Sequence, residues 1–120
     1  MIRKLLLPAM LLAASASAQA HHSRAMFDLQ RPVELTGTVR EFQFTNPHCY
    51  IQLLVTNSRG AQEEWSVEMG APSHLRGAGW KKTTLRSGDR IKVTIAPLRN
   101  GSRGGELVSA TTVDGRSLVS

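Results

Sequence analysis

Two adjacent histidines stand where the mature chain is expected to begin. Ala18-Gln19-Ala20 is typical of a signal-peptidase site, and cleavage after Ala20 leaves His21 as the N-terminus. The α-amine and ring Nδ1 of His21 can chelate a metal. His22 offers a second set of nitrogen donors, which consists of the α-amine, the deprotonated amide between the two residues and the Nδ1 of His22. Because such nitrogen sets favour Cu(II) and Ni(II), we expect copper or a similar divalent metal and no other cofactor.

His48 is the best candidate for a third ligand. It follows Asn46-Pro47, where the fixed φ of proline helps to aim it. The segment from Ser23 to Pro32 can stretch over about 30 Å at ~3.3 Å per residue, so the terminal histidines can reach His48. The alternatives are a histidine pair without any metal role and a turn histidine that bonds backbone. Possible extra ligands, whose thioethers favour Cu(I), are Met26, Met69 and His74.

The remaining reactive side chains do not form a catalytic set. Cys49 follows His48, but neighbouring residues on a strand point to opposite faces, so they cannot act as nucleophile and base. We expect Cys49 to be buried and inert. Glu63 and Glu64 resemble the solvated start of a strand. Gly101 to Gly105 is expected to be a flexible hairpin loop, since it lacks the lysine and helix of a phosphate loop. We therefore predict that the protein is not an enzyme.

Positive charge is concentrated in the C-terminal half. The net charge is +6. Between residues 76 and 103, Asp89 is the only acidic residue, against Arg76, Lys81, Lys82, Arg86, Arg90, Lys92, Arg99 and Arg103. Such a stretch can meet an anionic partner, and we predict a possible anionic-ligand surface at Lys81, Lys82, Arg86 and Arg90. The alternative is a solvated strand face with basic loops.

The first 20 residues are typical of an export signal. Arg3 and Lys4 precede the apolar run from Leu5 to Ala14, which is too short to span a bilayer stably. We expect a periplasmic or secreted protein without a transmembrane segment in the mature chain. Cleavage after Ala18 and an uncleaved anchor are the alternatives. The predicted organisation is a signal peptide at 1–20, an N-terminal extended arm at 21–32 and a β-barrel domain at 33–120.

Alternation of apolar and polar residues predicts five short strands. The first, over 33–44, changes phase between Val39 and Phe42, which indicates a bulge or strong bend. The others are expected at 49–55, 65–69, 91–95 and 107–113. Pro72 to Gly77 is expected to form a short helix between strands three and four. The fold class is therefore all-β, a small five-stranded OB-like partly open β-barrel, with a small β-sandwich as the alternative.

The chain also resembles a family of small secreted bacterial proteins described only as a domain of unknown function. The resemblance covers nearly all of the mature chain and implies a secreted β-barrel-like domain, without implying an activity. The segments that carry it are His21-His22-Ser23, Met26-Phe27-Asp28, Leu35-Thr36-Gly37-Thr38-Val39, Thr45-Asn46-Pro47-His48, Gly79-Trp80, Leu85-x-x-Gly88-Asp89 and Pro97-Leu98-Arg99-Asn100-Gly101.

Two classes of function follow from these features. The first is an exported protein that binds copper or a similar metal through its processed N-terminal histidines. The second is a non-enzymatic binding module for an anionic or small apolar ligand that uses the basic half. A purely structural or interaction role is a third possibility. We expect no nucleic-acid partner, because few aromatic residues are available for stacking on bases.

Overall fold

The computed structural model describes residues 24–118, so the predicted cleavage site, His21 and His22 lie outside the described residues. The elements in chain order are η1 (Arg24–Met26), β1 (Val33–Gln43), β2 (Tyr50–Thr56), β3 (Gln62–Glu68), α1 (Pro72–Gly77), β4 (Arg90–Pro97), β5 (Gly104–Thr112) and β6 (Ser117–Leu118). The predicted helix is confirmed with the expected bounds. The two-residue strand β6, which pairs with the end of β5, was not predicted.

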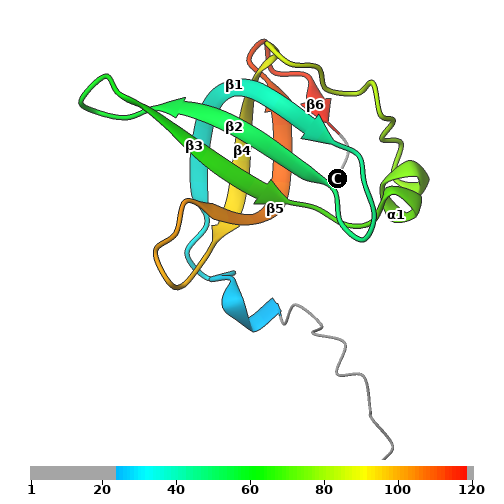
Figure 1. Cartoon of the computed structure of the whole chain (residues 1–120), viewed down its shortest axis with the longest axis horizontal. Helices are drawn as coiled ribbons and strands as arrows, with labels where there is room; N and C mark the ends of the chain where they lie inside the picture. Colours follow the sequence, from blue (N-terminus) through cyan, green and yellow to red (C-terminus); the bar gives the residue numbers. More distant parts are fainter. Residues whose placement is uncertain (1–23, 119–120) are drawn as a thin grey trace, which may run out of the picture.

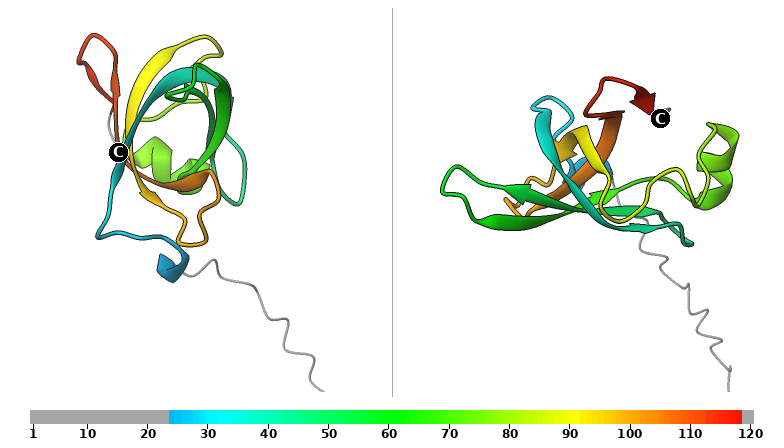
Figure 2. Two further views of the ribbon diagram at one scale, coloured as in Figure 1. Left: turned by 90° about the vertical axis from the view of Figure 1, so that its left-hand side faces the viewer. Right: turned by 90° about the horizontal axis from the view of Figure 1, so that it is seen from above.

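The five long strands close into a barrel (Figures 1 and 2). Strand β1 pairs with β2 on one side and with β4 on the other, and the antiparallel ladder continues from β2 to β3 and from β4 to β5. A short parallel pairing of β3 with β5 closes the ring. This connectivity, with α1 as the one α-helix of the described residues and placed between β3 and β4, confirms the expected OB-like barrel and excludes the β-sandwich. The ring of strands is closed by the β3–β5 pairing, so the prediction of a partly open barrel is wrong in that respect.

The predicted change of phase in the first strand is a β-bulge. The register of β1 against β2 shifts between Val39 and Glu41, so Arg40 is the additional residue. Before the bulge β1 pairs with β4 as well, while beyond it β1 follows only β2. The bulge therefore bends one continuous strand so that it can serve both sides of the barrel.

Two glycines allow the barrel to close. Gly104 and Gly105 lie in β5, opposite Ser66 and Val67 of β3, so the prediction of a flexible loop through Gly105 is wrong for these two residues. A Cβ on Gly104 would lie 2.9 Å from the carbonyl oxygen of Ser66. A Cβ on Gly105 would lie 2.9 Å from Ile95 Cδ1, and closer still to the carbonyl oxygen of Ala96. The missing side chains let three strands approach closely, as expected where backbone meets backbone.

The barrel interior holds the predicted apolar residues. Cys49 is fully buried with its strand neighbours, which confirms its predicted location, and Trp80 packs into the core at 2% exposure. The Trp80 ring lies 5.8 Å from the Phe42 ring, in a tilted arrangement typical of aromatic pairs. The largest fully buried side chains of the described residues are Val39, Cys49, Ile51, Leu53, Val67, Trp80, Ile91, Val93 and Ile95.

Residues 24–32 pack along the loop between β4 and β5. Residues Arg24–Met26 form the 3-10 turn η1, so the prediction of an extended arm is wrong for these three residues. Phe27 is buried and forms an isolated bridge with Leu98. Asp28 N donates to Pro97 O at 2.8 Å, and Arg99 N donates to Met26 O at 2.9 Å. These contacts hold the arm beside one end of the barrel. Within residues 24–118, no helix is long and apolar enough to cross a membrane.

Candidate functional site

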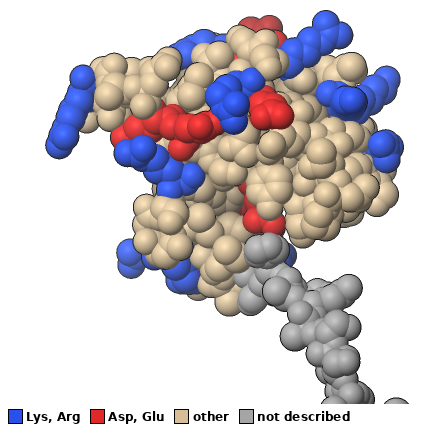
Figure 3. All heavy atoms as spheres, viewed as in Figure 1, with Lys and Arg blue, Asp and Glu red and all other residues tan. Residues whose placement is uncertain are grey.

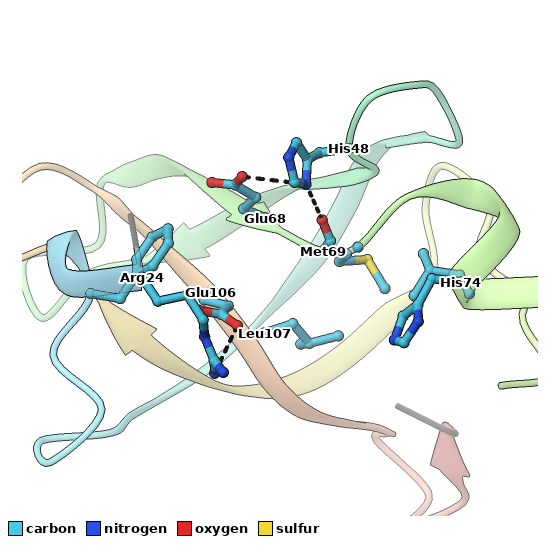
Figure 4. Close-up of a pocket in the computed structure, with 10 residues that line it drawn as sticks. Arg24, His48, Glu68, Met69, His74, Glu106 and Leu107 are labelled. Atoms are coloured by element: carbon cyan, nitrogen blue, oxygen red, sulfur yellow. Dashed lines mark hydrogen bonds and ion pairs between the residues drawn. The ribbon is translucent and has the colours of Figure 1, made fainter. Parts of the chain in front are cut away.

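A pocket of about 310 Å³ opens where β3 separates from β5 and continues toward α1 (Figure 4). The parallel pairing of these strands covers only residues 66–68 and 104–106, and Met69, Gly70 and Leu107 just beyond it line the pocket. Pockets of this size are typical of small-ligand sites. The pocket is lined by Arg24, Phe27, His48, Glu68, Met69, Gly70, His74, Leu75, Glu106 and Leu107.

His48 is placed in the pocket by backbone pairing next to it. Cys49 N donates to Gly70 O at 2.9 Å, and Met69 N donates to Cys49 O at 2.8 Å. These bonds join the loop before β2 to the end of β3. Because Cys49 turns into the core, its neighbour His48 turns the other way, toward the pocket.

The ring of His48 has a defined orientation. Its Nδ1 lies 3.1 Å from Met69 O and 3.6 Å from Oε1 of Glu68. A carbonyl oxygen can only accept a hydrogen bond, so Nδ1 carries the hydrogen and donates it. In a neutral imidazole of this tautomer the lone pair is on Nε2. The predicted alternative of a turn histidine bonded to backbone is thus correct for Nδ1.

Two carboxylates come from the paired strands that border the pocket. Glu68 of β3 and Glu106 of β5 are register partners. Glu106 accepts from Arg24 through two contacts, Nη2 to Oε1 at 3.1 Å and Nε to Oε2 at 3.4 Å. Glu68 lies near Tyr50, and burial together with the Glu68 charge raises the pKa of the Tyr50 hydroxyl. Arg24 compensates the charge of Glu106, so Glu68 is the carboxylate that supplies negative charge at this end of the pocket.

Apolar side chains form the rest of the wall. Phe27, Met69 and Leu75 are each 5% exposed. Leu107 is partly buried against the core. Figure 4 shows His74 across the pocket from His48, with the Met69 side chain directed toward it. The site is therefore a mainly apolar pocket with polar groups at its edges.

The structure brings together several of the residues proposed as metal ligands. His48, Met69 and His74 all line the pocket, whereas Met26 does not. His21 and His22 lie outside the described residues. Among residues 24–118, no three His, Cys, Asp or Glu side chains are grouped closely enough to hold a metal ion by themselves. The nitrogen site predicted from His21, His22 and His48 would therefore need ligands from the segment that precedes Arg24.

The predicted anionic-ligand surface lies apart from this pocket. Lys81, Lys82 and Arg86 are exposed along the connection from α1 to β4, and Arg90 is exposed at the first position of β4. None of the four lines the pocket. In the described part of the chain, none of the four forms a salt bridge with a carboxylate. Figure 3 shows acidic side chains gathered on the side of the molecule where β2 and β3 lie, with basic side chains around the periphery.

Sequence reasoning did not identify Arg24, Glu68 or Glu106 as site residues. Glu68 alternates with buried residues on β3 and so has the pattern of an ordinary outward-facing strand residue. Glu106 follows two glycines, and that pair was the available signal that two strands come close together there. Arg24 carries no local signal, because its position depends on how the arm docks.

Comparison with known proteins supports the fold. A model of the family described as "Family of unknown function (DUF6152)" matches residues 9–108. The crystal structure of the mitochondrial single-stranded DNA binding protein Rim1 of S. cerevisiae is similar, with a TM-score of 0.53 and 8% sequence identity over 72% of this chain and 95% of that chain. At this identity the similarity concerns the fold alone. Among curated proteins, none matches the chain.

Proposed function

Because the chain belongs to the DUF6152 family of unknown function, we propose its function from the site: it is an exported, non-enzymatic β-barrel protein that binds copper or a similar divalent metal. The proposed ligands are His21, His22 and His48. The proposal includes removal of residues 1–20 by signal peptidase, since that step creates the α-amine next to the two imidazoles.

The observation that carries the proposal is that Arg24 and His48 line the same pocket. His21 is three residues ahead of Arg24, so the chain holds it within about 10 Å of that anchor, at ~3.3 Å per residue. The sequence alone allowed a reach of about 30 Å without a direction. The docked position of Arg24 shortens that reach, and the pocket volume exceeds what a metal ion needs and leaves room for imidazole rings.

The surroundings of His48 favour a role as ligand. Metal-ligating histidines usually donate their other ring N–H to a backbone carbonyl or a carboxylate, which sets the tautomer and the ring orientation. His48 has both partners on that side, Met69 O at 3.1 Å and Glu68 at 3.6 Å. The contacts of Nδ1 thus support ligation through Nε2.

Copper titration of the exported chain tests this function. Cu(II) should bind one to one, observed as a mass increase in native mass spectrometry and as a nitrogen-rich signal in electron paramagnetic resonance. One alanine added before His21 alters the chelate without touching the barrel. It should lower the affinity at least about tenfold, as should His48→Ala, which removes the ligand from the pocket.

A change of Lys92 to Gln is the control, because Lys92 is exposed on β4 and does not line the pocket. Its Cu(II) affinity should equal that of the unmodified chain. The proposal fails if the exported chain begins at Gln19. It also fails in this form if His48→Ala leaves the affinity and the copper spectrum unchanged, because the barrel then contributes nothing to the site.

The exposed basic residues favour a second candidate function. Lys81, Lys82, Arg86 and Arg90 lie within ten residues of one another without salt-bridge partners among the described residues. Uncompensated positive charge of this density attracts anionic surfaces. In this second proposal the protein is a non-enzymatic module that binds an anionic ligand through these four residues.

A nucleic-acid partner is not part of either proposal. The similar structure is, by its title, a single-stranded DNA binding protein. OB folds bind oligonucleotides on the outer face of β2 and β3, where bases stack on aromatic side chains. Here that face pairs Tyr50 with Glu68 and Leu54 with Glu64. Carboxylates on this face repel phosphates, and Tyr50 offers a single aromatic ring.

A further inference from the structure

The pocket contains a second set of possible ligands, separate from the proposed Cu(II) donors. Met69 and His74 lie on the α1 side of the pocket, and the Met69 side chain extends toward His74 (Figure 4). Both residues are described by the structure, and neither depends on the segment before Arg24. Met69 supplies a thioether and His74 an imidazole, and both groups lie at one end of an apolar cavity.

Local packing sets the position of the His74 ring. Pro72 begins α1, and Gly70 lies two residues before it, ahead of the N-cap Ala71. A Cβ on Gly70 would lie 3.0 Å from Cδ2 of His74, so the ring rests on a glycine directly after Met69. Within residues 24–118, no hydrogen bond or salt bridge to the His74 side chain is present, and its ring nitrogens are open to a ligand.

Burial sets the character of Met69. The residue is 5% exposed, and Leu75 and Leu107 border the same pocket. A thioether in such surroundings is a soft, polarisable donor, with little affinity for hard cations such as Mg²⁺ or Ca²⁺. Soft monovalent Cu(I) matches a thioether and an imidazole, whereas Cu(II) prefers the nitrogen set at the N-terminus.

We infer that the pocket is a binding site for Cu(I), with Met69 Sδ and the His74 ring as ligands. This inference rests on the proposed function for its biological setting. The two Cu(I) ligands are separate from the groups that form the proposed Cu(II) chelate. The protein thereby binds copper supplied in either oxidation state, through neighbouring donor sets of different softness.

Ag(I) is the probe for this site, because it has the ligand preferences of Cu(I) and does not change oxidation state under the conditions used. The exported chain is labelled with ¹³C on its methionine methyl groups and titrated with Ag(I). The Met69 methyl resonance should shift and saturate at one equivalent. Met26 is the internal control, since it is a methionine that does not line the pocket, and its resonance should stay in place.

Substitutions separate the ligand roles. Met69→Leu and His74→Gln should each weaken Ag(I) binding at least about tenfold, while Met26→Leu should leave it unchanged. Met69→Leu keeps the volume and apolar character of the side chain, and the thermal midpoint identifies any variant that loses its fold. If Met69→Leu is unstable, the response of the Met69 methyl group to His74→Gln decides instead.

Comparing Cu(II) binding with Ag(I) binding of the same variants distinguishes the two metal proposals. The chain with one alanine before His21 should lose Cu(II) affinity and bind Ag(I) as before. If Cu(II) binding is absent while Ag(I) still shifts Met69, the N-terminal chelate is wrong and the pocket site stands. The Cu(I) inference is overturned if both methionine resonances shift equally, or if Ag(I) affinity survives both Met69→Leu and His74→Gln.

Discussion

At the scale of single residues, Cys49 and His48 are neighbours in the chain whose side chains have different surroundings. The thiol faces the core, where burial raises its pKa; a backbone hydrogen bond with Thr45 and the charge of Arg76 act in the opposite direction. The side chain of the preceding residue, His48, faces the pocket. A thiolate is the reactive form of cysteine, so a raised pKa lowers the reactive fraction at any given pH.

We predict that native Cys49 reacts slowly with thiol reagents. The folded chain should be labelled far more slowly than the chain unfolded in denaturant, at neutral pH and also near pH 9.0, the ordinary pKa of the thiol. The physical reason is that folding both blocks access and keeps the proton on sulfur. Labelling followed by mass spectrometry measures this, and equal rates for the two states would contradict the core position of Cys49.

At the scale of elements, the pocket exists because β3 and β5 pair over a short distance and then separate. The pairing requires Gly104 and Gly105, and the separation exposes Glu68 and Glu106 at the border of the opening. The docked arm adds Arg24 from the other side through its ion pair with Glu106. Closure of the barrel and formation of the site therefore depend on the same strand contact.

We predict that Gly105→Ala destabilises the barrel. The added methyl group would contact Ala96 O and Ile95 Cδ1, and relieving such overpacking typically costs about 1–3 kcal/mol. The midpoint of urea unfolding should fall accordingly. Gly77→Ala is the matched control, because no atom lies within 4 Å of its added Cβ, and the helix position should tolerate alanine. Equal midpoints for both variants would show that the close approach is not required.

For the molecule as a whole, charge is divided between two regions. Acidic residues occupy the side formed by β2 and β3, where Glu64 pairs with Arg40 and Glu63 with Arg103. The basic residues of the connection from α1 to β4 have no such partners in the described part of the chain. An anionic surface would therefore meet the molecule at this connection and not at the OB-type binding face.

We predict that any binding to anionic vesicles depends on Lys81 and Lys82. Binding to vesicles of an acidic phospholipid should weaken steeply as salt rises, because the screening length shortens to ~8 Å near physiological ionic strength. Changing both lysines to Glu should weaken binding further, whereas Arg59→Glu on the hairpin between β2 and β3 should have a smaller effect. Absence of binding at low salt would make these residues ordinary solvated charges.

The sequence by itself determined the local features: the strand phases, a bulge or bend between Val39 and Phe42, the α1 bounds and the burial of Cys49. Each follows from a periodicity or a breaker residue within a few positions of the chain.

Only the tertiary structure decided which residues share the pocket. His48 could be proposed from its neighbours, but its proximity to Glu68, Met69 and His74 results from the pairing of β2 with β3. The position of Arg24 results from arm docking, and that of Glu106 from the parallel contact of β5 with β3. Such contacts join residues far apart in the chain, and their register depends on packing that no local pattern records.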